Sequence, residues 1–224
     1  MAMANTVSAV RIRDEVARLK RERIIGIAAE LFYERGYENT SLDAVAERMS
    51  ATKPFIYAHF ASKAELLAEI CSRGIASALD ALNGVLEMPG NPTERLAEVG
   101  RRFVAAVLTS QRHIAIFTRE EKHLRADDFR RINDMRRDFD RKLVGLLDEG
   151  VAAGAFHIHD TRMAALAIGG MVSWAYVWYR PGGRLTMEQT SQELAALILA
   201  LAGVRDSQAV ASHPFTDIAI EDRS

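Results

Sequence analysis

Residues 52–60 carry side chains suited to contact with a polyanion. In a helix that turns Ile56 and Phe60 inward, the positions left at the surface or near the ends are Lys53, Phe55, Tyr57, Ala58 and His59. This face combines aromatic rings with positive hydrogen-bond donors and has no carboxylate, which distinguishes it from an ordinary solvated helix face. The composition indicates a negatively charged partner such as nucleic acid.

Lys63 is a second candidate for an anion contact. It lies in the first turn of a predicted helix, where a cation opposes the helix dipole. A bound backbone phosphate would remove this conflict, because the ammonium and the free N–H groups of the helix start would form one clamp. The alternative interpretation is a solvated surface lysine.

The sequence offers little for catalysis or metal binding. Acidic and histidine residues in the middle of the chain could suggest a metal or acid-base site, namely Glu120, Glu121, His123, Asp127 and Asp128. They alternate with basic residues, which favours exposed ion pairs instead. His157 and His159 are too few for a structural zinc site, which needs four ligands. No Ser-His-Asp order, glycine-rich phosphate loop or cysteine cluster is present. We expect no metal, no cofactor and no enzymatic activity.

The elements that must position these residues are helices. Apolar side chains with one-faced helical spacing predict a first helix, which ends at Gly36; they are Ile24, Ile27, Ala28, Leu31 and Phe32. Thr40 is expected to cap a second, short helix, with Asp43 three residues further on. Its inner face is formed by Leu42, Val45, Ala46 and Met49.

A third helix is predicted to begin after Thr52, with Pro54 in its first turn, where a missing N–H costs nothing. Ser62 and Glu65 form a predicted capping box for a fourth helix that runs toward Leu82. Two short helices joined by a tight turn, at residues 40–49 and 52–60, have the dimensions of a helix-turn-helix. In that motif the second helix enters the major groove of DNA.

These residues resemble the DNA-binding region of TetR-family transcriptional regulators. The resemblance covers roughly residues 20–70 and rests on three runs in consistent order and spacing, IIGIAAELF at 24–32, GYENTSLDAVA at 36–46 and FIYAHFASKAELL at 55–67. It implies phosphate contacts by Thr40, Ser41, Thr52, Tyr57, His59 and Lys63, and base contacts by Lys53, Pro54 and Phe55.

This sequence departs from the family pattern at three positions. Ser50 occupies a turn position where the family usually has glycine, so a positive φ there would cost a modest strain. Pro54 and Phe55 replace a commoner small residue and a threonine, which leaves the base-reading set open. Phe55 could offer apolar contact to a thymine methyl, or it could pack beneath the first helix.

The whole chain is predicted to be all-α, with an N-terminal three-helix helix-turn-helix domain followed by a larger helical ligand-binding and dimerisation domain. The break at residues 88–92 separates the two regions, and later helical periods cover about 93–109, 128–153, 160–179 and 187–202, with a polar, charged stretch at 111–128. The expected divisions are a flexible arm at 1–15, the DNA-binding domain at 16–80, the second domain at 81–203 and a mobile tail at 204–224.

A reading head this short contacts few bases, so such proteins pair on two half-sites, and we expect a homodimer on a near-palindromic operator. The best surfaces are the uncharged residues 163–179 and the stripe of Leu194, Leu197, Ile198 and Leu201. Small residues such as Gly169, Gly170 and Ala175 would let helices approach closely in a four-helix interface. Alternatively both helices close the monomer core. Residues 163–179 are too short for a membrane span, and we expect a buried helix and no membrane partner.

The passage at residues 174–186 resembles the C-terminal domain of a TetR subgroup that controls fatty-acid or steroid catabolism and senses acyl-coenzyme A thioesters. Side chains that could wall an acyl slot, or lie near an anionic head, are Phe103, Val107, Phe117, Phe139, Trp174, Trp178, Arg180 and Arg184. The alternative is that the aromatic residues belong to the core and the arginines are solvated.

The single cysteine, with no secretory leader, favours a cytoplasmic protein. We therefore expect a sequence-specific repressor that a small-molecule effector releases from its operator. One alternative is an all-helical enzyme or small-molecule carrier with a structural N-terminal domain, which would show no preference among DNA sequences. Another is an activator or partner-binding adaptor with the same fold.

Overall fold

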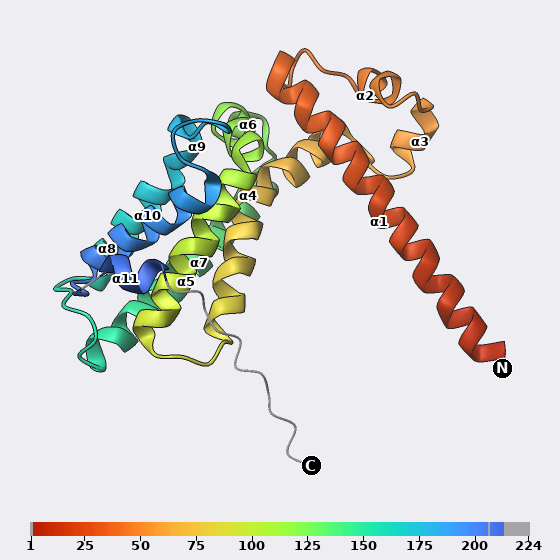
Figure 1. The fold of residues 1–224 in the computed structure, drawn as a ribbon. Coiled ribbons are helices and arrows are strands. Elements are labelled where there is room, and N and C mark those ends of the chain that lie inside the picture. The colour runs from red at the N-terminus through yellow and green to blue at the C-terminus, as the bar shows by residue number, and fades with distance from the viewer. Residues whose placement is uncertain (1, 206, 213–224) are drawn as a thin grey trace. The chain divides into compact units, whose positions relative to one another are not determined.

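The regular structure is helical throughout the part of the chain that the computed structural model describes, residues 2–205 and 207–212 (Figure 1). This confirms the predicted all-α fold. In chain order the elements are α1 (Ala2–Arg35), α2 (Leu42–Arg48), α3 (Lys53–Tyr57), α4 (Lys63–Leu86), α5 (Pro92–Thr109), α6 (Gln111–Glu120), the 3₁₀ helix η1 (Glu121–His123), α7 (Ala126–Ala152), α8 (Thr161–Ser173), α9 (Ala175–Trp178), α10 (Met187–Leu201) and α11 (Ser207–Ser212).

The helices form two compact units. The head unit combines the chain up to Arg73 with Arg112–Ile132, and the body unit combines Gly74–Gln111 with the residues from Asn133 onward. The boundary expected near residue 80 therefore lies earlier, and the polar stretch at 111–128 is helical and belongs mainly to the head. Ile116 and Phe117 explain this, since both are buried in α6.

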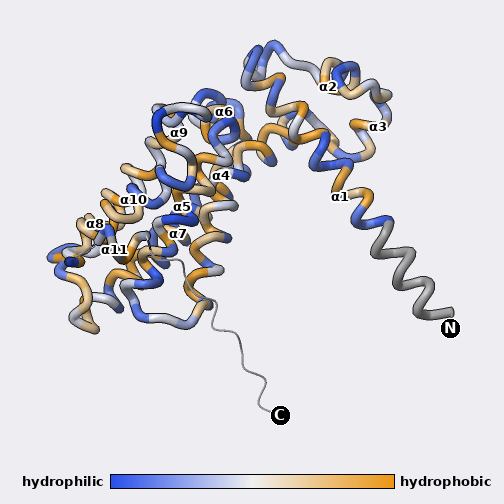
Figure 2. Tube along the Cα trace, viewed as in Figure 1, coloured by the Kyte–Doolittle hydropathy of each residue, from blue (hydrophilic) through white to orange (hydrophobic). Residues whose placement is uncertain are grey.

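The head core is built from the inner faces of three helices and the connection between two of them. Its fully buried large side chains come from α1, α3, α4 and the end of the α3–α4 connection, and they include Ile24, Leu31, Phe32, Ile56, Phe60, Leu66, Leu67 and Ile70. Along the helices, hydrophobic stretches of the chain are interspersed with hydrophilic ones, as in amphipathic helices that bury one face (Figure 2). The inward direction predicted for Ile56 and Phe60 is confirmed, since neither is exposed at all.

The start of α1 differs from the sequence expectation. Residues 2–15, expected to be a flexible arm, lie within this helix. No proline or glycine interrupts the sequence before Gly26, so the backbone has no reason to break there.

The cap of α2 also differs, by one residue. Ser41 is the N-cap, and its Oγ accepts the N–H of Ala44 at 3.0 Å. Thr40 instead turns inward and donates its hydroxyl to the carbonyl of Gly36 at 2.9 Å. The sequence offers two adjacent hydroxyl residues, and only the tertiary contact decides between them.

At the start of α4, Ser62 caps as expected and accepts the N–H of Glu65 at 3.1 Å. In a full capping box the carboxylate of Glu65 would accept the N–H of Ser62. Here it accepts the N–H of Ala61 instead, at 2.8 Å.

Close packing of α5 on α10 organises the body unit. A Cβ on Gly100 would lie 3.0 Å from the Cα of Ala195, so glycine is what lets these two backbones approach. The tail expected at residues 204–224 is ordered in part, because α11 packs on the same pair of helices. Ala211 is buried there, and its carbonyl accepts a hydrogen bond from Arg101 at 2.7 Å. Residues 213–224 lie outside the described residues.

Residues 163–179 form two helices, α8 and α9, which meet at Trp174. The expectation of a buried helix is wrong for one face of this segment within the single chain. Trp174 is 61% exposed and Leu166 is 60% exposed. Within the described residues no helix is both long and apolar enough to cross a membrane.

Cys71, the single cysteine of the sequence, is buried in α4. Burial raises the pKa of its thiol to about 12, and the nearby carboxylates of Glu120 and Glu121 act in the same direction. The thiol is therefore neutral at physiological pH and packs as a small apolar side chain.

The turn between α2 and α3 has a left-handed serine. Ser50 has φ +53°, and the N–H groups of Ser50 and Ala51 donate to the carbonyls of Glu47 and Ala46, both at 2.9 Å. This is the Schellman arrangement, in which glycine normally occupies the left-handed position. The strain expected from the absence of glycine is therefore present in the backbone.

Ser50→Gly should stabilise the protein. A left-handed L-residue costs about 1–2 kcal/mol, and the extra freedom of glycine in the unfolded chain returns roughly 0.4–1 kcal/mol of this, so a net gain of about 0.5–1 kcal/mol is expected. Urea denaturation followed by circular dichroism measures it. Ala58→Gly is the matched control, since Ala58 has φ −67° and should lose stability. Equal losses in both variants would contradict the strain assigned to Ser50.

Candidate DNA-binding site

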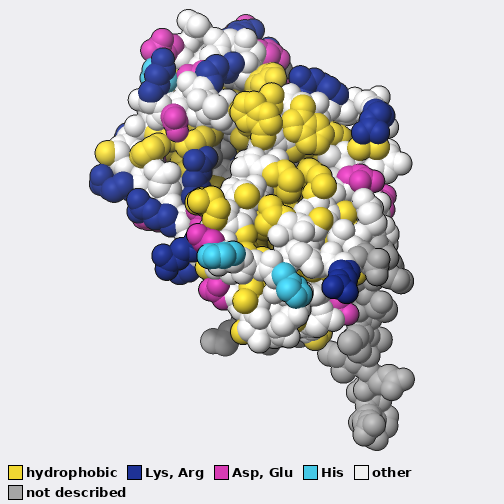
Figure 3. All heavy atoms as spheres, turned by 90° about the vertical axis from the view of Figure 1, so that its left-hand side faces the viewer, with side chains coloured by type: hydrophobic (Ala, Val, Ile, Leu, Met, Phe, Trp, Pro, Cys, Tyr) yellow, Lys and Arg dark blue, Asp and Glu magenta, His cyan; other side chains and the backbone are white. Residues whose placement is uncertain are grey.

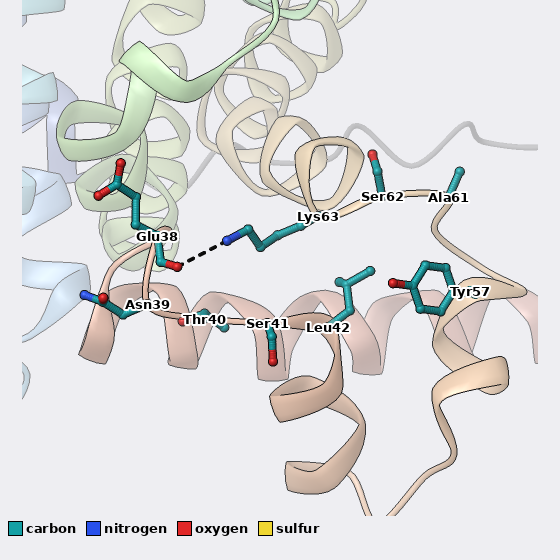
Figure 4. Close-up of a pocket in the computed structure, with 9 residues that line it drawn as sticks. All are labelled: Glu38, Asn39, Thr40, Ser41, Leu42, Tyr57, Ala61, Ser62 and Lys63. Carbon is teal, nitrogen blue, oxygen red and sulfur yellow. Dashed lines mark hydrogen bonds between the residues drawn. The ribbon is translucent and has the colours of Figure 1, made fainter.

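A groove lies where α2, α3 and the start of α4 meet. Its lining comes from the α1–α2 turn, the end of α3 and the α3–α4 connection, namely Glu38, Asn39, Thr40, Ser41, Leu42, Tyr57, Ala61, Ser62 and Lys63. Figure 4 shows Tyr57 on one side, facing Leu42, and Lys63 reaching across to the turn. The structure thus brings Thr40, Ser41, Tyr57 and Lys63 together, as the family resemblance implied.

The outward face of α3 is open to solvent. Thr52 stands at the N-cap, but its hydroxyl makes no capping hydrogen bond. Lys53 and Pro54 are exposed, and Tyr57 is 47% exposed. These residues present a hydroxyl, an ammonium and a phenol on one short element.

Phe55 lies between the two alternatives left open by the sequence. It is half-buried, its ring meets that of His59 edge to face at 5.2 Å between centroids, and the Nζ of Lys20 is 5.8 Å from its centre. One edge therefore packs within the head while part of the ring stays accessible. His59 is likewise half-buried.

Thr40 is placed differently from the expected phosphate contact. Its side chain is buried, at 1% exposure, and its hydroxyl is used by the carbonyls of Gly36 and Leu31. The expectation of a side-chain contact is corrected: this residue shapes the turn, and Ser41 beside it is exposed.

Lys63 has internal partners. Its Nζ donates to the carbonyl of Tyr37 at 2.9 Å and to that of Glu38 at 3.4 Å, and it lies 4.3 Å from the centre of the Tyr37 ring. These carbonyls relieve the conflict with the helix dipole that had suggested a bound phosphate. Lys63 is half-buried rather than fully solvated, and it holds the α1–α2 turn while lining the groove, so a phosphate contact by this residue stays a prediction.

A carboxylate whose position the sequence did not predict lies beside the outward face of α3. Asp43, from α2, pairs with the Nζ of Lys53 at 2.9 Å. This hydrogen bond raises the pKa of Lys53, so the ammonium stays charged. Helical spacing within one element could not show this, because the partner comes from the neighbouring helix.

Arg21 is another residue that the sequence did not single out. Its guanidinium lies 4.1 Å from the centre of the Phe60 ring and donates to the carbonyl of His59. It also lies 3.9 Å from a carboxylate oxygen of Glu65. Arg21 thus fixes the segment that follows α3, and it lies before the helical stripe that revealed α1.

The residues expected to wall an acyl slot differ in burial and in the unit to which they belong. Phe103, Val107 and Phe139 are buried in the body unit, with the rings of Phe103 and Phe139 4.6 Å apart. Phe117 belongs to the head unit. The remaining residues, Trp174, Trp178, Arg180 and Arg184, are exposed.

Arg180 folds back on its own segment and donates to the carbonyl of Val177 at 2.8 Å. A pocket that the structure does describe in the body is lined by α5, α10 and α11 and contains none of the expected acyl-slot residues. Its charged lining residues are Glu98, Arg101, Arg102 and Glu188. Among the described residues, no group of three His, Cys, Asp or Glu side chains is arranged to hold a metal ion.

Comparison with known proteins identifies related chains. Residues 24–70 match the family described as bacterial regulatory proteins, tetR family, and residues 89–202 match the tetracyclin repressor-like C-terminal domain. The chain is 29% identical over 194 residues to the HTH-type transcriptional repressor KstR2 of Mycobacterium tuberculosis, covering 80% of this chain and 91% of that protein.

Solved structures show the same fold. The structure of the ketosteroid transcriptional regulator KstR2 of Mycobacterium tuberculosis has a TM-score of 0.71 at 26% identity, covering 80% of this chain and 93% of that one. AibR in complex with isovaleryl coenzyme A and operator DNA has a TM-score of 0.68 at 28% identity, covering 80% and 97%. Proteins of this family bind operator DNA and small-molecule effectors, and they are not enzymes. The two family matches cover most of the chain, and the protein is therefore a member of the TetR family of DNA-binding transcriptional regulators.

Proposed function

We propose that this regulator is a repressor that binds a near-palindromic operator as a homodimer and leaves it when an effector binds the body. The observation that carries the proposal is the solvent-exposed outer face of α3, with Thr52, Lys53 and Tyr57 beside the groove at the start of α2. A short helix that keeps polar donors outward and only Ile56 fully inward is suited to a DNA groove.

The proposed contacts divide by chemistry. Ser41, Thr52 and Tyr57 supply hydroxyl groups for backbone phosphates, which fix the position of the head on the duplex. Lys53, Pro54 and the accessible part of Phe55 face the bases, where apolar contact with a thymine methyl is available to the ring. Lys53 must exchange its pairing with Asp43 for a DNA acceptor, and exposed pairs of this kind contribute only about 0.2–1 kcal/mol.

Tyr57→Phe should weaken operator binding about tenfold, because it removes one hydrogen bond to a charged phosphate oxygen, worth roughly 1.5–3 kcal/mol. The probe is a labelled duplex that the wild-type protein selects from a random-sequence pool, and fluorescence anisotropy gives Kd. Tyr33→Phe is the matched control, since Tyr33 is an exposed tyrosine of α1 outside the groove. If both variants bound as tightly as the wild type, the role of Tyr57 would be refuted.

The proposed dimer face lies on α8 and α10. Large apolar side chains are exposed along it, namely Met163, Leu166, Trp174, Leu197 and Leu201. Figure 3, which views the side of the molecule where α8 and α10 lie in Figure 1, shows hydrophobic side chains gathered into a patch there. Burying such a patch against its symmetry mate would create the four-helix interface expected from the sequence.

Leu166→Glu should convert the dimer to a monomer, because pairing would bury an uncompensated charge. Sedimentation velocity at micromolar concentration measures the mass, and Val151→Glu serves as control on α7, where Val151 is also partly exposed. The monomeric variant should also lose operator affinity, since each head then binds one half-site alone. A Leu166→Glu variant that stays dimeric would exclude this face.

For the effector we propose an acyl-coenzyme A thioester. The proposal is supported by the relative AibR, solved with isovaleryl coenzyme A and operator DNA, and by the ketosteroid regulator KstR2. In this chain the acyl group would have to part the contact between Phe103 and Phe139, and Arg180 or Arg184 would meet the anionic end. Such a ligand releases DNA only if it binds the released state more tightly than the operator-bound state.

Steroid-like or long-chain coenzyme A esters should therefore raise the thermal stability of the protein and dissociate it from the selected duplex. At about 100 times Kd a ligand of the folded state adds about 2.7 kcal/mol to the free energy of unfolding. Differential scanning fluorimetry and anisotropy report the two effects. Free coenzyme A and the free acids are the controls, and release by free acids instead of the esters would exclude this ligand class.

A further inference from the structure

The α1–α2 turn, residues 36–41, is held from α6 as well as from within. It connects the last turn of α1 to the N-cap of α2 and forms part of the proposed DNA groove. Its position therefore decides where Ser41 and the first N–H groups of α2 face.

Arg119, near the end of α6, caps the C-terminus of α1. Its guanidinium donates to the carbonyl of Tyr33 at 3.2 Å and also to that of Phe32. The last carbonyls of a helix lack partners inside the helix and carry the negative end of its dipole. A cation placed there satisfies both needs.

Glu120, the next residue, binds the turn itself. Its side chain is buried, with only 6% of the residue exposed, and Oε1 accepts the N–H of Tyr37 at 3.3 Å and the Nε of Arg119 at 2.9 Å. A Cβ on Gly36 would lie 3.5 Å from the same oxygen, so the carboxylate sits directly against the turn. A carboxylate this buried needs such partners, because an unpaired one would be costly.

Tyr37 is thereby held on both sides of its backbone. Its N–H donates to Glu120, while its carbonyl accepts from Lys63 at 2.9 Å and from the N–H of Thr40 at 3.2 Å. Its ring lies 5.1 Å from that of His123 in η1 and 5.4 Å from that of Phe32. All of these contacts lie within the head unit.

The geometry points to Arg119 and Glu120 as positioning residues, which hold the α1–α2 turn in the conformation that presents Ser41 to DNA. The inference rests on the proposed DNA contacts. It assigns a role in DNA binding to two residues of α6, which lies outside the helix-turn-helix. Neither residue lines the groove, so neither is assigned a contact with DNA itself.

The test compares Glu120→Ala with Glu120→Gln. The glutamine retains an Oε1 acceptor for Tyr37 and Arg119, whereas alanine leaves both donors unpaired. In the free protein, hydrogen exchange of the Tyr37 amide should become faster in the alanine variant only. Affinity for the selected duplex should fall about tenfold in the alanine variant and stay within about twofold of the wild type in the glutamine variant.

Two further measurements separate positioning from the alternatives. Because no phosphate contact is lost, the slope of log Kd against log salt should equal that of the wild type in Glu120→Ala and in Arg119→Ala. Glu121→Ala is the matched control, since it removes an exposed carboxylate one residue away. Arg119→Ala also supplies a second test if Glu120→Ala does not fold, which circular dichroism would show.

Three results would overturn the inference. One is faster exchange at Tyr37 with unchanged affinity, which would make the contact merely structural. Another is a salt slope reduced by about one in Arg119→Ala, which would mean that Arg119 itself contacts a phosphate. The third is a wild-type protein that binds no duplex; this would refute the proposed DNA contacts as well, and the wild-type titration alone would reveal it.

Discussion

Burial of Ile56 and Phe60 is the constraint on which the proposed DNA-binding surface depends. Helix α3 has five residues, too few hydrogen bonds to persist by itself in water. It holds its direction because these two side chains are wholly inside the head core. The outward direction of Lys53 and Tyr57 then follows from helical geometry, and so does the place of Thr52 at the start of the element.

The sequence predicted the helices well because their apolar spacing and their terminal residues agree. It could not decide questions in which two residues compete for one role or a partner comes from elsewhere. Thr40 and Ser41 are both good caps, and the inward bond of Thr40 to Gly36 decides between them. The carbonyl partners of Lys63, on Tyr37 and Glu38, could not be predicted because they lie more than twenty residues away in the sequence. The polar residues of α6 gave no sign that Arg119 contacts the end of α1 and that Glu120 contacts the α1–α2 turn.

The body unit shows a different limit of sequence patterns. An uncharged helical segment is apolar enough to be buried, but its composition does not say whether its own chain covers it. Helix α8 buries Ala164, Ile168 and Val172 on one side and exposes Met163 and Leu166 on another. The inner side was predictable from spacing, whereas the outer side became visible only with the fold. For Phe103 and Phe139, composition does not say whether an aromatic side chain faces a ligand or the core. Their size suited the wall of a ligand pocket, but in the structure their rings pack on each other.

The neutral, enclosed thiol of Cys71 makes this protein well suited to site-directed spin or dye labelling. Since it is the single native cysteine and its pKa is raised to about 12, maleimide and methanethiosulfonate reagents have little thiolate to attack at neutral pH. A cysteine introduced at an exposed position of either unit would then be the reactive one without any change to the native residue. In the proposed homodimer, one label on each subunit would report the spacing between equivalent points directly, with and without bound molecules.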